Sequence, residues 1–179
     1  MTFTLPPFNF AQLLGFIAMA LQIWSVSFKS DRRLNIIWMV SNAFWLAHFY
    51  LLGAHAGAIN VFINFCRCAT YVVRDWRATP HSKTIFLVLI AAYTLSAPFT
   101  IHTWVDVLPL LSSYAITVAF FVFSGIQGRL ILMIGNIGWL IYALLHGSYG
   151  GVFTNITVIA LGLMTVARMR ADQVKTAAR

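Results

Sequence analysis

The sequence contains few acidic residues and few charges of either sign. Only 4 of its 179 residues are Asp or Glu, against 12 Lys or Arg, and charged residues make up 9% of the chain. A soluble domain carries about a quarter charged residues, whereas 60% of this chain is hydrophobic and its mean hydropathy is +0.83. These values exclude a soluble globular domain and indicate a membrane protein.

The scarcity of acids also argues against an enzyme. The four acids all lie at predicted loops or helix ends, so no carboxylate within a span could serve acid–base catalysis or a proton relay. The patterns Ser-x-x-Lys, Gly-x-Ser-x-Gly, His-Glu-x-x-His and the Gly-rich phosphate loop are all absent from the sequence. We therefore expect no enzymatic activity.

Cysteine and histidine are too sparse to suggest a metal or a cofactor. Cys66 and Cys68 are two residues apart in one predicted helix, so their side chains diverge and cannot form a disulfide unless the helix unwinds. We expect them to be small packing residues. His48 and His146 are the His residues clearly within spans, but they do not correspond in the repeat described below, which leaves a two-His haem site with weak support.

The basic residues show where the chain crosses the membrane. Eleven of the twelve fall into four short segments, 29–33, 74–83, 129 and 168–179, which alternate with segments that contain no Lys or Arg. By the positive-inside rule, the N-terminus is outside and the C-terminus is cytoplasmic. Because these charges lie at helix ends beside anionic headgroups, we expect membrane lipid rather than nucleic acid as a partner.

The alternation predicts seven spans of about 20 residues each. The first apolar stretch is read as a span and not as a cleaved signal peptide, because it lacks a basic n-region and Gln12 and Gln22 interrupt it. The expected spans are 9–28, 34–52, 54–74, 82–100, 104–123, 129–146 and 148–168.

A shift of 94 positions superimposes the chain on itself. The informative matches involve residue types that are scarce here or costly in lipid: Asn42 with Asn136, Trp45 with Trp139, Gly53 with Gly147, Gly57 with Gly151, and Arg74 with Arg168. The repeat pairs spans one to three with spans five to seven in the same orientation. It predicts a single membrane domain, 1–179, with triple-helix bundles at 9–77 and 104–170, a linker helix at 82–100 and a basic cytoplasmic tail at 171–179. Such a parallel 3+1+3 plan is SWEET-like.

The second helix of each half carries a set of polar and aromatic residues. Asn42, Trp45 and His48 are three residues apart and share one helix face. Span six repeats the set as Asn136, Trp139 and Tyr142. These groups could flank a central polar solute, or each Asn could tie helices together while each Trp packs near the interface. For the Asn pair, solute binding and helix packing both remain open. The Trp pair lies nearer the middle of its spans than the interface, which favours a place in a cavity.

The third helix of each half adds further candidates. Asn60, Asn64 and Arg67 form one stripe in span three, and span seven carries Asn155. Arg67 is the Lys or Arg that does not lie at a predicted helix end, and it is about 10 Å from the cytoplasmic end at 1.5 Å per residue. It either snorkels to or pairs with a cytoplasmic helix end, or it binds an anionic or carbonyl group of a solute.

Glycine and proline mark packing and bending points. The repeated Gly-x-x-x-Gly pairs at 53–57 and 147–151 allow close helix approach, so the last two helices of each half should form a tight hairpin, compatible with a monomer or a homodimer. Gly15 and Pro109 correspond under the shift, and each is a candidate kink or hinge in the leading helix of its half.

Two short stretches carry a family resemblance. Leu-Leu-Gly-Ala-His-Ala-Gly-Ala at 51–58, followed by Phe-Ile-Asn-Phe-Cys-Arg at 62–67 and then Arg74, resembles the YgjV family of bacterial inner-membrane proteins. Gly-Ser-Tyr-Gly-Gly at 147–151 is similar to the second half-repeat of that family. The resemblance implies a multi-pass protein of the bacterial inner (plasma) membrane and no particular function.

The 3+1+3 plan separately resembles the SWEET and PQ-loop group, which includes sugar and vitamin-precursor facilitators and a cargo receptor. There a Trp on the second helix and an Asn on the third helix of each half line the pocket. The resemblance implies this role for Trp139 and Asn155, and for Trp45 with Asn60 or Asn64. The Pro-Gln pair typical of the group is missing from span one.

These observations predict a membrane facilitator, working as a uniporter, for a small neutral polar solute such as a sugar or a nucleoside-like compound. The two bundles would provide alternating access, and the lack of acids within spans favours uniport over proton coupling. The alternative is a non-transporting membrane receptor or an assembly or scaffold protein, in which the polar residues only hold helices together.

Overall fold

The computed structural model describes residues 9–25, 31–73, 81–123 and 125–177. Within these residues the chain forms seven α-helices and one short 3-10 helix and contains no strand, which confirms the expected all-α class. Their bounds are α1 Phe10–Ser25, α2 Asp31–Leu51, α3 His55–Val73, α4 Ser82–Thr100, η1 Trp104–Asp106, α5 Val107–Val122, α6 Gly125–Leu145 and α7 Tyr149–Ala177.

Each predicted span coincides with one α-helix, except that the span 104–123 comprises η1 and α5, and the predicted and observed bounds differ mainly at the ends. Helix α1 is shorter than expected, with 16 residues, while α7 continues past position 168 for a total of 29 residues. Of the basic clusters, Lys29, Arg74, Arg77 and Arg179 lie outside the described residues, as does the match between Arg74 and Arg168.

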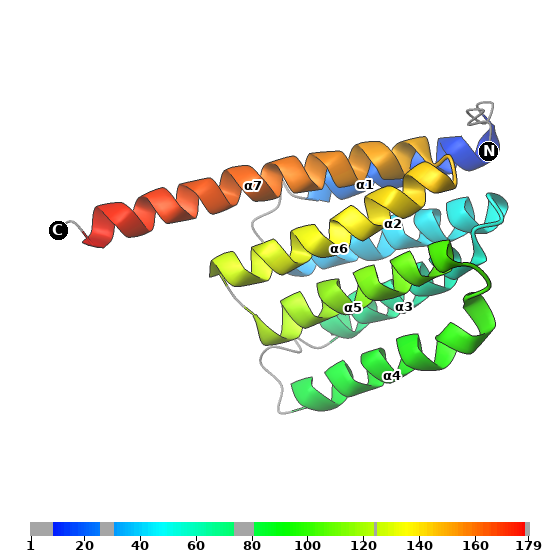
Figure 1. Ribbon diagram of the computed structural model, residues 1–179, viewed down its shortest axis with the longest axis horizontal. Coiled ribbons are helices and arrows are strands. Elements are labelled where there is room, and N and C mark those ends of the chain that lie inside the picture. The colour runs from blue at the N-terminus through cyan, green and yellow to red at the C-terminus, as the bar shows by residue number, and fades with distance from the viewer. Residues whose placement is uncertain (1–8, 26–30, 74–80, 124, 178–179) are drawn as a thin grey trace.

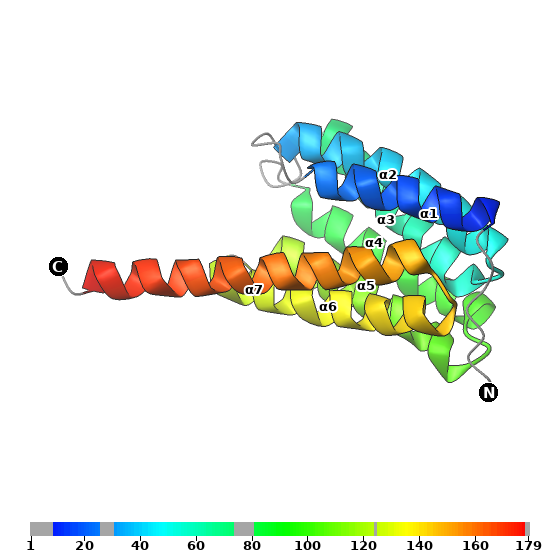
Figure 2. The same cartoon turned by 90° about the horizontal axis from the view of Figure 1, so that it is seen from above.

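Six of the helices form a ring. Helices α1, α2, α3, α5, α6 and α7 each pack against the next in this order, and α7 closes the ring against α1. In Figure 1 they form two layers, α1 to α3 behind and α5 to α7 in front, while α4 lies at the lower edge against α3 and α5. Seen from above, the layers converge where α1 begins and separate toward the C-terminal end of α7 (Figure 2).

Four elements among the described residues are long and apolar enough to cross a membrane: α4, Trp104–Val122, α6 and Tyr149–Lys175. Helix α1 is apolar but shorter. Helices α2 and α3, with 21 and 19 residues, have sufficient length but carry many of the chain's polar residues. Spanning by these three helices stays a prediction.

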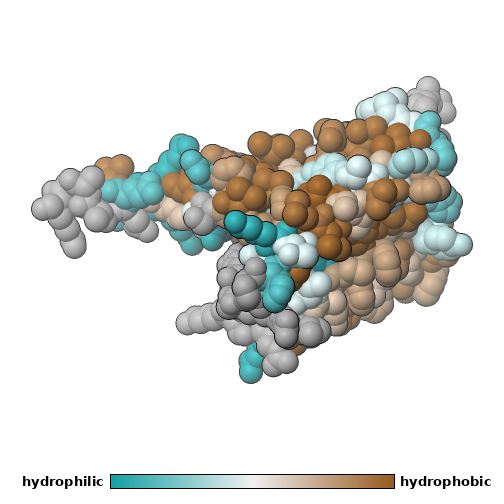
Figure 3. All heavy atoms as spheres, turned by 90° about the horizontal axis from the view of Figure 1, so that it is seen from below, coloured by the Kyte–Doolittle hydropathy of each residue, from teal (hydrophilic) through white to brown (hydrophobic). Residues whose placement is uncertain are grey.

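Polarity in the bundle is inverted relative to a soluble protein. Leu95 and Phe99 are 71% and 78% exposed, whereas the side chains of Gln12, His48 and Asn60 are fully buried. Figure 3 shows apolar residues over the body of the bundle and hydrophilic residues toward its two ends. A lipid-facing surface requires this arrangement, because polar groups are costly in hydrocarbon and find partners inside the bundle.

The α2–α3 and α6–α7 turns have the same geometry. Gly53 and Gly147 take positive φ angles of 71° and 63°, which favour glycine. The residue after each glycine donates its amide to the carbonyl five positions earlier, at 2.9 Å in the first turn and 2.8 Å in the second. Each glycine therefore ends its helix in a Schellman motif, and the hairpins expected from the Gly-x-x-x-Gly pairs are present.

The two candidate hinges, Gly15 and Pro109, lie in different structural environments. Gly15 lies where α1 crosses α7, and a Cβ atom on Gly150 would come within 2.6 Å of the Gly15 carbonyl. Pro109 lies in the first turn of α5, where a missing amide hydrogen costs the helix nothing. Their role as hinges stays a prediction.

Candidate functional site

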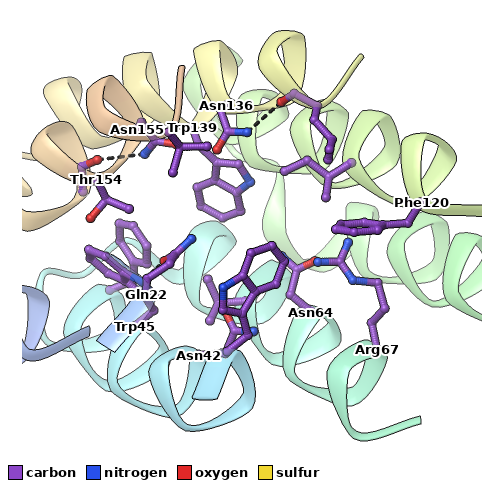
Figure 4. A pocket seen from close by; sticks show the side chains of 17 residues that line it. Gln22, Asn42, Trp45, Asn64, Arg67, Phe120, Asn136, Trp139, Thr154 and Asn155 are labelled. Carbon is purple, nitrogen blue, oxygen red and sulfur yellow. Dashed lines mark hydrogen bonds between the residues drawn. The ribbon is translucent and has the colours of Figure 1, made fainter. Parts of the chain in front are cut away.

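The ring of six helices encloses a cavity of about 160 Å³. All six ring helices contribute to its wall, and no residue of α4 is among those that line it. The polar and aromatic wall residues are Gln22, Trp38, Asn42, Trp45, Phe49, Asn64, Arg67, Phe120, Asn136, Trp139, Thr154 and Asn155 (Figure 4).

The cavity brings together most of the residues predicted from the sequence as a binding site. Asn42, Trp45, Asn64, Arg67, Asn136, Trp139 and Asn155 all lie on its wall. His48, Asn60 and Tyr142 do not; they are buried elsewhere in the bundle. A role for any of them in binding a substrate stays a prediction.

Many wall residues occur as pairs separated by 94 positions. These pairs are Gln22 and Ile116, Trp38 and Leu132, Asn42 and Asn136, Trp45 and Trp139, Val61 and Asn155, and Asn64 and Val158. Equivalent positions in the two halves thus face the same cavity. Only two of the pairs have identical side chains, so the wall has different chemistry on its two sides.

Two Asn side chains of the second half each have a side-chain oxygen that is free to accept a hydrogen bond in the cavity. Asn136 donates its Nδ2 to the carbonyl of Leu132 at 2.7 Å, and Asn155 donates its Nδ2 to that of Gly151 at 2.8 Å. Both bonds lie within one helix, one turn back. The Oδ1 atoms accept no hydrogen bond from the described residues, so each can receive one from a solute.

The amides on the first half also connect helices. Asn64 accepts a hydrogen bond from the Tyr93 hydroxyl at 2.9 Å and donates to Ser113 at 3.5 Å, which ties α3 to α4 and α5. Asn42 donates to the sulfur of Cys68 at 3.6 Å. These two residues therefore have structural partners as well as a place on the wall.

Arg67 is buried on the wall of the cavity. Its side chain is 7% exposed, it donates a long hydrogen bond of 3.4 Å to the hydroxyl of Thr117, and its guanidinium carbon lies 5.0 Å from the centre of the Phe120 ring. Figure 4 shows the guanidinium beneath that ring. The stacking is a cation–π contact.

Aromatic rings close the cavity toward the end where α1 begins. Phe49 lies 5.7 Å from Trp45, 5.8 Å from Trp139 and 5.7 Å from Tyr142, measured between ring centres. These rings form the centre of the main hydrophobic cluster. They separate the wall amides from the layer of hydrogen bonds described next.

Hydrogen bonds join the two halves at this end, which we call the closed end. His48 approaches the carbonyl of Ala11 with Nδ1 and the hydroxyl of Ser148 with Nε2, both at 2.6 Å. Because a carbonyl only accepts, Nδ1 carries a proton and donates to Ala11, while Nε2 and the Ser148 hydroxyl share the second hydrogen bond. The hydroxyl of Tyr142 accepts the Gly57 amide at 2.8 Å. His48 and Tyr142 correspond in the repeat, and each bonds the opposite half near the start of its third helix.

Gln12 adds a third connection at the closed end. Its Nε2 donates to the carbonyl of Gly147 at 2.6 Å, and its Oε1 accepts the amide of Tyr149 at 3.2 Å. Asn60, by contrast, donates only to Ala56 in its own helix, and its Oδ1 is buried without a partner among the described residues.

Five polar or aromatic wall residues are not among those predicted from the sequence: Gln22, Trp38, Phe49, Phe120 and Thr154. Gln22 accepts a hydrogen bond from the Trp45 indole at 2.9 Å and is a polar residue within an apolar span, which is the signal that identified the Asn residues. Trp38 is seven residues before Trp45 and so shares its helix face. Thr154 bonds its own helix, and Phe120 carries no distinguishing pattern.

The described residues contain no group of three or more His, Cys, Asp or Glu side chains placed to hold a metal ion. Cys66 is partly buried and Cys68 is buried, and both are free thiols.

Comparisons with known proteins place the chain in a family. The family Imp-YgjV, described as bacterial inner membrane protein, matches residues 9–173. Inner membrane protein YgjV of Escherichia coli (strain K12) is 25% identical over 158 residues, which cover 88% of this chain and 83% of that relative. No solved structure matches the chain. The wider likeness to the SWEET group stays a prediction, but the apolar helices and the family match agree on the compartment. The chain therefore belongs to the YgjV family of bacterial inner membrane proteins and resides in the inner membrane.

Proposed function

We propose that the protein is a facilitator that moves a small polar solute across the inner membrane by alternating access between the bundles 9–77 and 104–170. The observation that carries the proposal is the cavity between the two halves, lined by amides and indoles and closed at one end. A buried polar cavity between repeated halves is where transporters of this plan hold their solute.

The repeat supports a common origin of the two halves. The matched Schellman turns and the wall residues paired at a spacing of 94 place equivalent groups at equivalent depths. We therefore assign seven spans in a parallel 3+1+3 arrangement, with α4 as the linker outside the ring.

Charge supports the orientation. The basic residues Arg129, Arg168, Arg170 and Lys175 lie at the start of α6 or in the second half of α7, which are at the end opposite the closed end. By the positive-inside rule this end is cytoplasmic. The closed end is then outside, and the separation of the two layers in Figure 2 corresponds to an inward-facing conformation.

Cavity size limits the solute. An apolar cavity of about 150 Å³ in another protein holds one benzene molecule, so a volume of about 160 Å³ suits a single-ring solute. A monosaccharide of one ring offers hydroxyls for the amides and a ring face for the indoles. Transport without proton coupling follows from the position of the four acids, which the sequence places at loops and helix ends.

Thermal unfolding of the purified protein with a panel of sugars, nucleosides and vitamin precursors tests the proposal. A ligand at ten times its Kd adds about 1.4 kcal/mol to stability. Asn155→Ala should remove that gain and solute uptake by proteoliposomes, with little change in intrinsic stability, because Asn155 bonds only its own helix. Thr157→Ala is the matched control, since Thr157 makes the same kind of bond from α7 away from the cavity.

Trp139→Ala is a second variant, with the 70% exposed Trp104→Ala as its control. Loss of uptake in the cavity variants and not in the controls supports the proposal. Uptake that survives both Asn155→Ala and Trp139→Ala would place the solute elsewhere.

One observation favours a receptor or scaffold as the second candidate. Asn64 and Asn42 bond neighbouring helices, so part of the polar wall serves packing. On that reading Asn42→Leu and Asn64→Leu lower stability yet spare function, and no solute in the panel shifts the unfolding temperature.

A further inference from the structure

We infer that the transported solute carries a carboxylate and that Arg67 binds it. The inference rests on the proposed function and deepens it by naming the chemical class of the solute. It replaces the expectation of a neutral solute, because the structure places a buried cation on the cavity wall.

Arg67 has more hydrogen-bonding capacity than its surroundings use. A guanidinium offers five N–H donors and stays charged in proteins. The described residues provide one long hydrogen bond to Thr117, a contact with the Cys68 thiol and the face of Phe120. A buried charge held by so few partners is costly unless an anion compensates it.

No described acid compensates the charge. Asp106 is the acid whose side chain the structure describes, and its carboxylate accepts hydrogen bonds from Thr103 and from the amide of His102 beside the start of α5, at the closed end. In the repeat, Arg67 corresponds to Leu161, so the second half supplies no equivalent cation. The cation is therefore peculiar to one side of the cavity, as recognition of a single anionic group requires.

The rest of the wall suits a small organic acid. A carboxylate and a guanidinium fit each other through two parallel hydrogen bonds. The cavity offers free acceptors at Asn136 and Asn155 for hydroxyls or amines, and the indoles of Trp45 and Trp139 for a flat ring face. A single-ring carboxylate or a sugar acid matches this combination.

A phosphate from a lipid headgroup would use the same chemistry. We assign a soluble carboxylate because Arg67 faces a cavity enclosed by six helices and lined by amides and indoles, whereas a lipid must also place its acyl chains. The experiment below separates these sources.

Matched pairs of solutes test the inference in purified protein: nicotinate with nicotinamide, benzoate with benzamide, and glucuronate with glucose. Binding is followed by thermal unfolding and by tryptophan emission, because Trp38, Trp45 and Trp139 line the cavity. We expect at least one carboxylate to bind ten times more tightly than its neutral partner, since a hydrogen bond to a charged group contributes about tenfold to a hundredfold.

Variants then assign the effect to Arg67. Arg67→Gln should remove the preference for the carboxylate and leave binding of the neutral partner within twofold, and Arg67→Lys should keep part of the preference. Arg129→Gln removes an exposed cation at the start of α6, toward the same end of the bundle, and should change neither. If Arg67→Gln does not fold, the preference of the native protein within each pair still decides the matter.

Three outcomes would overturn the inference, and they differ in whether the proposed facilitator function survives. Equal binding of both members of a pair, unchanged in Arg67→Gln, refutes the carboxylate but keeps the facilitator. Binding of no member counts against both proposals. Stabilisation by phosphatidylglycerol nanodiscs over phosphatidylcholine nanodiscs, dependent on Arg67 and without any soluble ligand, makes Arg67 a lipid site.

Discussion

At the residue scale, buried polar side chains differ in whether they have partners. His48, Tyr142 and Gln12 are fully buried, and each makes a hydrogen bond to the opposite half. The hydroxyl of Ser112, by contrast, is buried without a partner among the described residues. A satisfied buried group stabilises the fold modestly, whereas an unsatisfied one retains its full desolvation cost.

Ser112 and its neighbour Ser113 form a matched pair for this comparison. Ser112→Ala removes an unpaired hydroxyl and should raise stability by about 1 kcal/mol. Ser113→Ala removes the hydroxyl that accepts from Asn64 at 3.5 Å, and should lower stability or leave it unchanged. Thermal unfolding in one detergent measures both variants; a lower unfolding temperature for Ser112→Ala would show that its hydroxyl has a partner.

At the element scale, glycines set how closely helices approach. Gly150 packs against the backbone of Gly15, where α7 crosses α1, so no flexible side chain can move aside for a methyl group. Gly162, further along α7, faces the flexible side chain of Met133 instead. This difference makes the start of α7 the rigid contact between the halves.

Gly150→Ala should therefore push α1 and α7 apart, whereas Gly162→Ala should be tolerated. Overpacking of this kind costs about 1–3 kcal/mol, and alanine favours a helix over glycine by about 1 kcal/mol, which offsets the cost only at position 162. The unfolding temperatures of the two variants give the answer. Equal temperatures would mean that the α1–α7 contact adjusts easily.

At the scale of the whole molecule, the two layers of three helices meet at one end and separate at the other (Figure 2). The closed end carries the hydrogen bonds that His48, Tyr142 and Gln12 make to the opposite half, and the basic residues of α6 and α7 lie at the other end. The proposed orientation places those basic residues in the cytoplasm.

Reporter fusions test that orientation. Green fluorescent protein fused after Arg179 should fluoresce, and alkaline phosphatase at the same position should be inactive, because the proposed orientation puts the end of α7 in the cytoplasm. A fusion of each reporter within the α4–η1 turn, near His102, should give the reverse pattern. Phosphatase activity at the C-terminus would invert the assignment and make the closed end cytoplasmic.

The sequence by itself determined the helices and their turns. Long apolar stretches and basic clusters predicted all seven helices, since a chain in lipid must satisfy its backbone within each segment. Gly53 and Gly147 were predictable as turn residues, because few other residues accept their positive φ angles. The repeat also favoured a cavity position for Trp45 and Trp139 and left that position open for Asn42 and Asn136; all four line the cavity.

Only the tertiary structure decided which polar residues share the cavity. Helical periodicity places His48 on the same face as Trp45, and Asn60 on the same stripe as Asn64, but it cannot give depth relative to other helices. Because the layers converge at the closed end, His48 and Tyr142 meet the opposite half there, while Gln22 and Arg67 reach the cavity wall. The way the helices cross therefore decides which polar residues line the cavity and which form hydrogen bonds at the closed end. Helix crossing depends on packing between segments that are distant in the sequence.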